Sequence, residues 1–160
     1  MAIDPNVFRS AMGTFATGVT VVTTNNDGYL HGLTANGVSS LSLDPMLFIV
    51  CVAKKANAHV EMTRAESFAV SVLTEAQEAI SNTFASSSAP EPNSLRGVAY
   101  HCGMTGDPLV DGALAYIECK KNGALDGGDH TIFVGEVVSV EIVSDDPPLL
   151  YYRGGYRKIA

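Results

Sequence analysis

A polar stretch at residues 32–45 holds the residue types with which this chain could bind a charged ligand. It reads Gly-Leu-Thr-Ala-Asn-Gly-Val-Ser-Ser-Leu-Ser-Leu-Asp-Pro, and apolar runs at 19–24 and 46–53 flank it. Short hydroxyl side chains together with free backbone N–H groups suit an anion, especially a phosphate. The same hydroxyls can instead cap turns. The pattern therefore predicts a polar segment between two strands that either binds an anion or only makes a turn.

A second anion-binding pattern follows the apolar run at 46–53. Lys54, Lys55 and Asn57 come directly after this run and before a helix that we expect at 57–66. A helix N-terminus beside two lysines can bind an anion, although the lysines can also simply be solvated. Because the two polar stretches flank one short strand, a bend or a neighbouring chain could bring both to the same ligand.

Two further stretches contain residues that could contact a cofactor ring. In Gly127-Gly-Asp-His130, a histidine held by a glycine-rich turn could donate a hydrogen bond or carry positive charge near neutral pH. It could equally be an ordinary surface histidine. In the segment 151–157, Tyr-Tyr-Arg-Gly-Gly-Tyr-Arg, the aromatic and Arg side chains could stack on a planar ring or merely close the fold.

The common nucleotide and catalytic fingerprints are missing from the chain. Neither G-x-G-x-x-G nor G-x-x-x-x-G-K-[ST] occurs, so a nicotinamide or flavin would have to bind without a Rossmann domain or a P-loop. The segment 37–41 lacks the second glycine of a nucleophile elbow. His101 and Cys102 form an isolated pair, so we expect no metal site.

The composition indicates one globular domain over residues 1–160, with 46% hydrophobic and 17% charged residues. A formal net charge of −7 disfavours nucleic acid or an anionic membrane surface as a partner. Three cysteines without a C-x-x-C spacing favour a reducing compartment over a disulfide framework. We see neither a signal peptide nor a membrane span, and we therefore expect a cytoplasmic protein.

The spacing of apolar residues predicts six or seven strands and three helices. A helix begins at Asp4-Pro5, a strand pair at 18–24 and 29–34 is joined by a turn at 25–28, and the run at 46–53 reads as a strand buried on both faces. The helix at 57–66 would point Val60 and Met62 inward. The remaining expected elements are a strand at 67–73, a helix from the N-cap Thr74 to about Phe84, a surface loop at 86–112, a strand at 113–121, a turn-rich connection at 122–129, and strands at 130–143 and 149–152. Such short links favour an antiparallel barrel with helices outside it.

Five motifs occur in an order that covers nearly the whole chain. They are Phe-Arg-x-x-Met-Gly-x-Phe-x-Thr-Gly-Val-Thr-Val-Val-Thr from Phe8 onward followed by the stretch 32–45, then Phe-Ala-Val-Ser-Val-Leu at 68–73, Gly-Asp-His at 128–130, and Pro-Leu-Leu-Tyr-Tyr-Arg-Gly at 148–154. In order and spacing the chain resembles the short-chain flavin reductase family. This family comprises the reductase components of two-component flavin-dependent monooxygenases.

The resemblance implies a mainly β (α+β) fold, namely an FMN-binding split β-barrel built as an antiparallel Greek-key barrel with flanking helices. It implies a homodimer with the flavin near the subunit interface. The implied activity is that of an NAD(P)H:flavin oxidoreductase that supplies reduced flavin to a separate oxygenase component. The cofactors would be FMN or FAD, with NADH or NADPH as the hydride donor. A flavin carrier without efficient turnover, or a ferric reductase acting through reduced flavin, are the alternatives.

The resemblance also assigns roles to individual residues. The flavin ribityl chain and phosphate would be held by Thr34, Ala35, Asn36, Ser39 and Ser40, and the second cofactor-binding segment would contribute Cys51, Lys54 and Asn57. Phe84 ends a helix that approaches the flavin, His130 would line the nicotinamide side, and the tail with Tyr152, Arg153 and Tyr156 would close over the site. The chain departs from the family pattern at Gly37, at Met46 and in the segment after Cys51.

Overall fold

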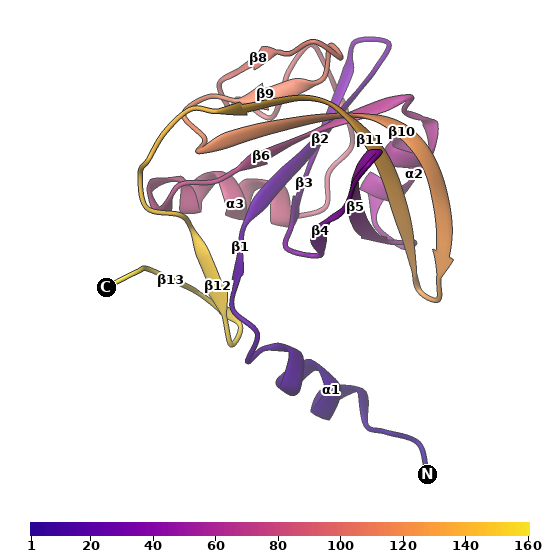
Figure 1. The fold of residues 1–160 in the computed structure, drawn as a ribbon, viewed down its shortest axis with the longest axis vertical. Coiled ribbons are helices and arrows are strands. Elements are labelled where there is room, and N and C mark those ends of the chain that lie inside the picture. The colour runs from indigo at the N-terminus through magenta and orange to yellow at the C-terminus, as the bar shows by residue number, and fades with distance from the viewer.

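The computed structural model describes residues 1–160 and is built on an eight-stranded sheet (Figure 1). The strand order is β4-β5-β11-β10-β6-β2-β3-β7, and every pairing in it is antiparallel. The strands are β2 (Thr20–Asn26), β3 (Tyr29–Ala35), β4 (Val38–Leu43), β5 (Met46–Ala53), β6 (Ser67–Val72), β7 (Glu91–Pro92), β10 (Ala115–Gly127) and β11 (His130–Ile142). The β10–β11 hairpin, from the last third of the chain, lies between β5 and β6, which come from its first half. The sheet is therefore formed by strands that are far apart in the sequence. This arrangement agrees with the mainly β, split-barrel fold that we predicted.

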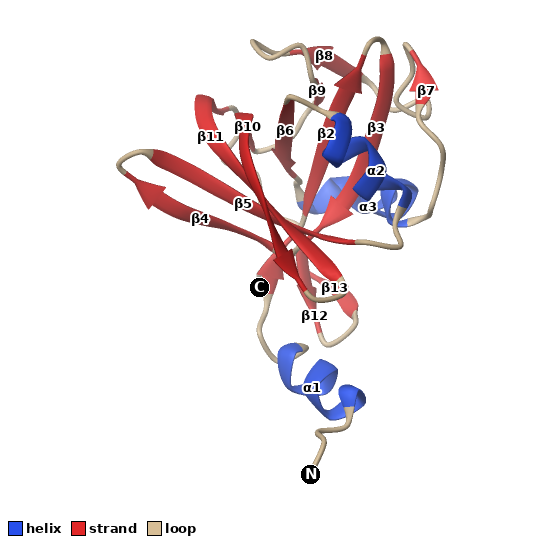
Figure 2. Cartoon of the chain, turned by 90° about the vertical axis from the view of Figure 1, so that its right-hand side faces the viewer, coloured by secondary structure: helices blue, strands red, loops and turns tan.

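Two smaller sheets and three α-helices complete the fold. The first small sheet holds β1 (Thr17–Gly18), β12 (Leu150–Tyr152) and β13 (Gly155–Arg157), and the second pairs β8 (Tyr100–Cys102) with β9 (Pro108–Val110). The helices are α1 (Pro5–Met12), α2 (Asn57–Arg64) and α3 (Glu78–Ala85), the last preceded by a 3₁₀ turn, η1 (Glu75–Gln77). Figure 2 shows α2 and α3 beside β2 and β3, whereas α1 projects from one end of the molecule. None of the helices is long and apolar enough to cross a membrane.

Local sequence signals placed the first hairpin and the third helix correctly. Asp27 and Gly28 adopt φ values of 56° and 87°, as a two-residue turn between twisted strands requires. The backbone N–H of Gly28 donates to Asn25 Oδ1 at 2.8 Å, which fixes the turn. At the start of η1, Thr74 and Gln77 form a reciprocal capping box. The predictions for these two connections are therefore confirmed.

The polar stretch 32–45 is mostly strand rather than a connecting segment. Only Asn36 and Gly37 link β3 to β4, and β4 pairs with β5 from Val38 to Leu43. The prediction missed β4 because this strand is at the edge of the sheet, where one flank is unpaired and polar side chains are tolerated. The prediction of a turn-rich connection at 122–129 was also wrong, because this segment too is polar and yet forms a strand. Bulges near Cys119 and Gly123 let β10 continue through this polar segment to Gly127.

Three predictions about burial were also wrong. Strand β5 alternates, with Phe48, Val50 and Val52 buried and its other face only half-buried. In α2, Met62 is 2% exposed but Val60 is 56% exposed, because residues three and four positions apart share the buried face. The region 86–112, which we predicted as a long surface loop with a little local order, contains the short strands β7, β8 and β9, but it also contributes the buried side chains Leu95, Leu109 and Val110 and is therefore not confined to the surface.

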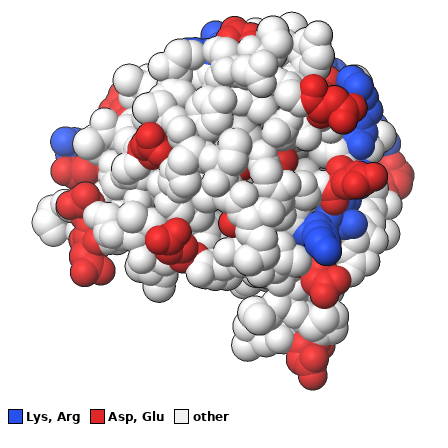
Figure 3. All heavy atoms as spheres, turned by 90° about the horizontal axis from the view of Figure 1, so that it is seen from above, with Lys and Arg blue, Asp and Glu red and all other residues white.

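Two apolar clusters support the region where the candidate ligand-binding residues lie. The larger cluster fills the space between α2 and the sheet and includes Val50, Phe68 and Phe133. The second includes Leu73, Phe84 and Leu149 and joins α3 to the C-terminal segment. By contrast, α1 has no buried residue. The face shown in Figure 3 carries scattered acidic side chains with few basic ones, in keeping with the net charge.

Candidate functional site

The first part of the candidate site is a pocket of about 280 Å³ at the N-terminus of α2, which we call the α2 pocket. Its lining residues come from β3, the start of α2, the end of α3 and the segment after it: His31, Gly32, Leu33, Ala53, Lys55, Ala56, Asn57, Ala58, Phe84, Ala85, Ser86, Ser87 and Ser88. Helix α2 begins without a side-chain cap, so its first N–H groups are available to a ligand. Lys55 makes no salt bridge, and Ser87 donates no side-chain hydrogen bond. Free N–H groups, a free ammonium and a free hydroxyl suit an anion such as a phosphate.

The wall of the α2 pocket at 86–88 is held by hydrogen bonds from β3, from α2 and from the loop residue Arg96. The Ser88 carbonyl accepts from His31 Nε2 on β3 and from Asn57 Nδ2 on α2, both at 3.1 Å. The Ser86 Oγ accepts from Arg96 Nη1 at 3.0 Å. His31 is only 7% exposed. These contacts fix the segment that places three hydroxyl groups around the pocket.

A second pocket of about 230 Å³, the tyrosine pocket, lies farther along β3 and α3. It is lined by Val19, Thr34, Asn36, Ser81, Ala85, Tyr151 and Tyr156. Thr34 Oγ1 donates to the Ser81 carbonyl at 2.6 Å, and Ser81 Oγ is hydrogen-bonded to the Tyr156 hydroxyl at 2.6 Å. The rings of Tyr151 and Tyr156 meet edge to face with centroids 5.7 Å apart. The β12–β13 hairpin is thereby attached to α3 and forms one wall of this pocket.

A third pocket of about 380 Å³, the α1 pocket, lies between the end of α1 and the half-buried face of β5. Its lining residues are Met12, Phe15, Thr17, Asn36, Gly37, Val38, Ser39, Ile49 and Cys51. The α2 and tyrosine pockets share Ala85, and the tyrosine and α1 pockets share Asn36. The three pockets therefore adjoin one another near the end of β3 and the start of β4, and we refer to them together as the groove.

Seven of the predicted cofactor-binding residues line this groove: Thr34, Asn36, Ser39, Cys51, Asn57, Phe84 and Tyr156. The tertiary structure thus brings together residues from both polar stretches and from the C-terminal tail. Ala35 lies in the apolar core, and its carbonyl accepts from Thr20 Oγ1 at 2.7 Å. Ser40 is exposed and lines none of the three pockets.

The predicted residue His130 lies at the tip of the β10–β11 hairpin, and Lys54, which directly follows β5, contacts this tip. Lys54 forms an ion pair with Asp126, and its backbone N–H donates to the Asp129 carbonyl at 2.9 Å. His130 Nδ1 donates to Asp129 Oδ1 at 2.7 Å, and this hydrogen bond lowers the pKa of the Asp129 carboxyl. In register, His130 pairs with Ala53, which lines the α2 pocket. His130 therefore stands at the edge of the groove, with an imidazole oriented by a carboxylate.

Tyr152 and Arg153 lie at the end of β12, outside the groove. The Arg153 guanidinium is 5.4 Å from the centre of the Tyr152 ring. Arg153 lines a separate pocket together with residues of α1. The structure therefore divides the predicted tail residues, with only Tyr156 at the groove.

The groove residues that sequence reasoning did not single out include His31, Ser81, Ser87 and Ser88. The run of three serines at 86–88, directly after a helix, was a signal that could have identified two of them. For the lysines, only the structure shows that Lys54 is paired with Asp126 whereas Lys55 lines the pocket. The unpaired polar groups fit a flavin phosphate, and the aromatic side chains of the tyrosine pocket fit a planar ring.

A family model described as a flavin reductase like domain matches residues 12–160. The chain belongs to the flavin reductase-like family. Its curated relatives include the reductase subunit HsaB of a flavin-dependent monooxygenase from Mycobacterium tuberculosis, strain H37Rv, which is 39% identical over 159 residues. That match covers 98% of this chain and 83% of the relative. An NADH-dependent FAD reductase from Streptomyces globisporus is 40% identical over 163 residues, covering 99% of this chain and 89% of that protein.

Solved structures of this family share the fold. BorF, the flavin reductase component of a bacterial two-component tryptophan halogenase, is 39% identical with a TM-score of 0.90, covering 98% of both chains. The NADH:FAD oxidoreductase SgcE6 from Streptomyces globisporus, solved in complex with NAD and FAD fragments, is 38% identical with a TM-score of 0.90. The match covers 100% of this chain and 97% of SgcE6. The predicted fold and family are therefore confirmed.

Proposed function

We propose that this protein is an NAD(P)H-dependent flavin reductase that transfers hydride from NADH or NADPH to FMN or FAD and supplies reduced flavin to a separate monooxygenase component. The observation that carries the proposal is the groove. It places a pocket with free anion-binding groups beside a pocket with two aromatic rings, and Ala85 lines both. Family membership and the names of the relatives support the same activity.

The phosphate end of the flavin is assigned to the α2 pocket. There the first N–H groups of α2, the Lys55 ammonium and the hydroxyls of the 86–88 segment would hold the anion. The polar chain and ring would then extend toward Thr34 and Asn36 and the tyrosine pocket. The bound flavin supplies the redox chemistry. The protein positions the two reactants, which is the main catalytic requirement when two rings must stack in a reactive geometry.

His130 is assigned to the nicotinamide side of the site. Its imidazole is oriented by Asp129 and lies at the edge of the groove, where it can donate a hydrogen bond to a bound nicotinamide dinucleotide. We expect His130→Ala to raise the KM for NADH or NADPH and to leave the flavin dissociation constant nearly unchanged. Steady-state kinetics measures the KM, a fluorescence titration measures the flavin dissociation constant, and stopped-flow reduction measures the reduction rate and the nicotinamide affinity. An unchanged rate and nicotinamide affinity in the variant would contradict this role.

The exposed apolar side chains support a homodimer. Phe8 and Phe15 near α1 and Leu43 at the end of β4 are 63%, 68% and 87% exposed. Apolar surface of this kind on a projecting helix and an edge strand is typical of an interface with another chain. Phe15 also lines the α1 pocket, so a second chain seated on α1 would adjoin the groove. Light scattering should give twice the mass of the chain, and a fully active monomer would contradict the assignment.

The activity is tested by mixing the purified protein with NADH or NADPH and free FMN or FAD and following the nicotinamide absorbance band. Oxidation that depends on the flavin is the expected result. If no combination of donor and flavin is turned over although flavin binds, the protein is a flavin carrier and the proposal fails. Single variants of neighbouring serines refine the assignment, because Ser39 lines the groove and Ser40 does not. Ser39→Ala should weaken flavin binding, with Ser40→Ala as the matched control.

A further inference from the structure

His31 is a buried histidine whose side-chain hydrogen bond connects its strand to the loop after α3. The side chain is 7% exposed, and Nε2 donates to the Ser88 carbonyl at 3.1 Å. A carbonyl oxygen only accepts hydrogen bonds, so Nε2 must carry the hydrogen. Burying a polar ring costs free energy unless the ring is hydrogen-bonded, and the bond of His31 joins β3 to the segment 86–88 instead of to another strand. His31 therefore fixes one end of this segment.

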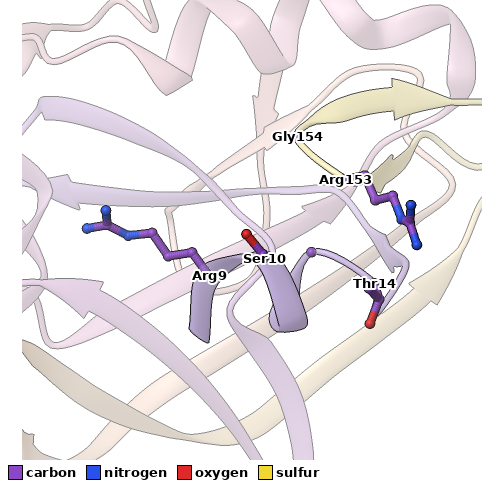
Figure 4. Close-up of a pocket in the computed structure, with 6 residues that line it drawn as sticks. Arg9, Ser10, Thr14, Arg153 and Gly154 are labelled. Atoms are coloured by element: carbon purple, nitrogen blue, oxygen red, sulfur yellow. The ribbon is translucent and has the colours of Figure 1, made fainter. Parts of the chain in front are cut away.

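Arg96 fixes the other end of the segment 86–88. Its Nη1 donates to the Thr83 carbonyl near the C-terminal end of α3, where a positive charge is favourable, and to Ser86 Oγ at 3.0 Å. Arg96 is half-buried and has a φ of 53°, a left-handed backbone conformation that is strained for an arginine. By contrast, Arg9 and Arg153 are exposed, and their side chains point away from each other (Figure 4). Arg96 is thus held in place by the fold, whereas those two arginines are solvated.

Of the three hydroxyls in the segment 86–88, the two anchors leave those of Ser87 and Ser88 free for a ligand. The Ser86 hydroxyl both accepts and donates a hydrogen bond at the α3 end of the segment. Both lone pairs of the Ser88 carbonyl are occupied by donors at the other end. The Ser87 and Ser88 hydroxyls bond to no other group of the protein, and no carboxylate lines the α2 pocket. The clamped segment therefore presents free hydroxyl donors, the kind of group that a phosphate binds.

We propose that His31 and Arg96 are positioning residues that hold the segment 86–88 in a phosphate-binding conformation, so that the protein selects phosphorylated flavins over riboflavin. The inference rests on the proposed function, because it uses the flavin phosphate assigned to the α2 pocket. Donors that are already ordered raise the affinity, since binding does not have to order them. Two flavins supply the phosphate: FMN as a monoester and FAD as a diphosphate. Riboflavin has the same ring and ribityl chain without a phosphate, so the clamp should not affect its binding.

The test is a fluorescence titration of the full chain with riboflavin, FMN and FAD, without NADH. We expect His31→Leu to weaken the binding of FMN or FAD about three- to tenfold and to change riboflavin affinity by less than about twofold. His31→Gln keeps an N–H donor and should stay close to the wild type, whereas Arg96→Met should behave like His31→Leu. His59→Leu is the matched control, because His59 is half-buried and hydrogen-bonded to Thr131 Oγ1 at 2.7 Å but lines none of the three pockets. Circular dichroism confirms that the variants are folded.

The pattern of losses separates a positioning role from a merely structural one. In the background Ser87→Ala, Ser88→Ala, the change His31→Leu should cost little further affinity, because the hydroxyls that it positions are gone. A loss confined to FMN identifies the monoester as the occupant, and a loss confined to FAD identifies the diphosphate; both support the proposal. Equal losses for riboflavin and the phosphorylated flavins, or an unchanged preference in His31→Leu, would overturn it even if the wild type reduces flavin with NADH. A wild type that binds no flavin would instead refute the proposed function, and this inference with it.

Discussion

Replacing Gly32 by alanine tests whether the wall of the α2 pocket is as closely packed as the structure indicates. A Cβ atom at this position would lie 2.6 Å from both Cδ1 and Cε1 of Phe84, much closer than carbon atoms can approach. The Phe84 ring is 2% exposed and belongs to an apolar cluster, so it has little room to move. Overpacking of this kind costs roughly 1–3 kcal/mol, of which the lower entropy of the unfolded alanine chain returns about 0.4–1 kcal/mol. We therefore expect a net loss of about 1–2 kcal/mol in the free energy of unfolding.

Urea unfolding followed by circular dichroism measures this loss, and a flavin titration measures the accompanying weakening of binding. Gly123→Ala is the matched control, because a Cβ atom at that strand position would meet no atom within 4 Å. In the Phe84→Leu background, Gly32→Ala should cost clearly less, since the ring that it strikes is gone. If Gly32→Ala and Gly123→Ala have equal unfolding free energies and equal flavin affinities, the inferred contact between Gly32 and Phe84 is refuted.

Two further predictions concern buried polar groups. Burial raises the pKa of Asp107 above its ordinary value of 3.8, despite hydrogen bonds from Ser67 and Thr105, so the folded state binds this proton more tightly than the unfolded state. Its contribution to stability is therefore present at low pH and is lost as the pH rises from 3.8 through the folded pKa. Between about pH 4 and pH 7, the urea midpoint of Asp107→Asn should decline less with rising pH than that of the wild type. Parallel pH profiles of the two proteins would contradict the assignment. Tyr156→Phe should cost about 1–2 kcal/mol, because it leaves the buried Ser81 hydroxyl without its 2.6 Å partner. A double-mutant cycle with Ser81→Ala should show coupling of about 1 kcal/mol, and purely additive losses would show that the hydrogen bond contributes nothing.

The fold was predictable where short-range chemistry decides the backbone. The Asp27-Gly28 turn needs residues that accept positive φ, and the capping box at Thr74 needs a hydroxyl and an amide three residues apart. Patterns of this kind are complete within a few residues. The alternation of β6 is similarly local, and the strand predicted at 67–73 is observed at Ser67–Val72. The motif order identified the family because it covers nearly the whole chain.

The composition of the groove could not be predicted from the sequence to the same degree. Whether a lysine is paired or free depends on a distant hairpin, since Asp126 on β10 neutralises Lys54 and leaves Lys55 for the α2 pocket. The serines at 87 and 88 belong to the groove only because His31 and Asn57 hold the Ser88 carbonyl. Each of these contacts joins elements that are far apart in the chain.

By itself, the sequence determined the family, the mainly β architecture and the two polar stretches that supply the candidate site. Only the tertiary structure decided which side chains face the groove, that β4 is a strand at the edge of the sheet, and that Arg153 lies beside the end of α1, outside the groove. The physical reason is range. Turns, caps and strand propensity depend on neighbouring residues, whereas the facing of a side chain depends on the register and packing of elements that meet only after the chain has folded.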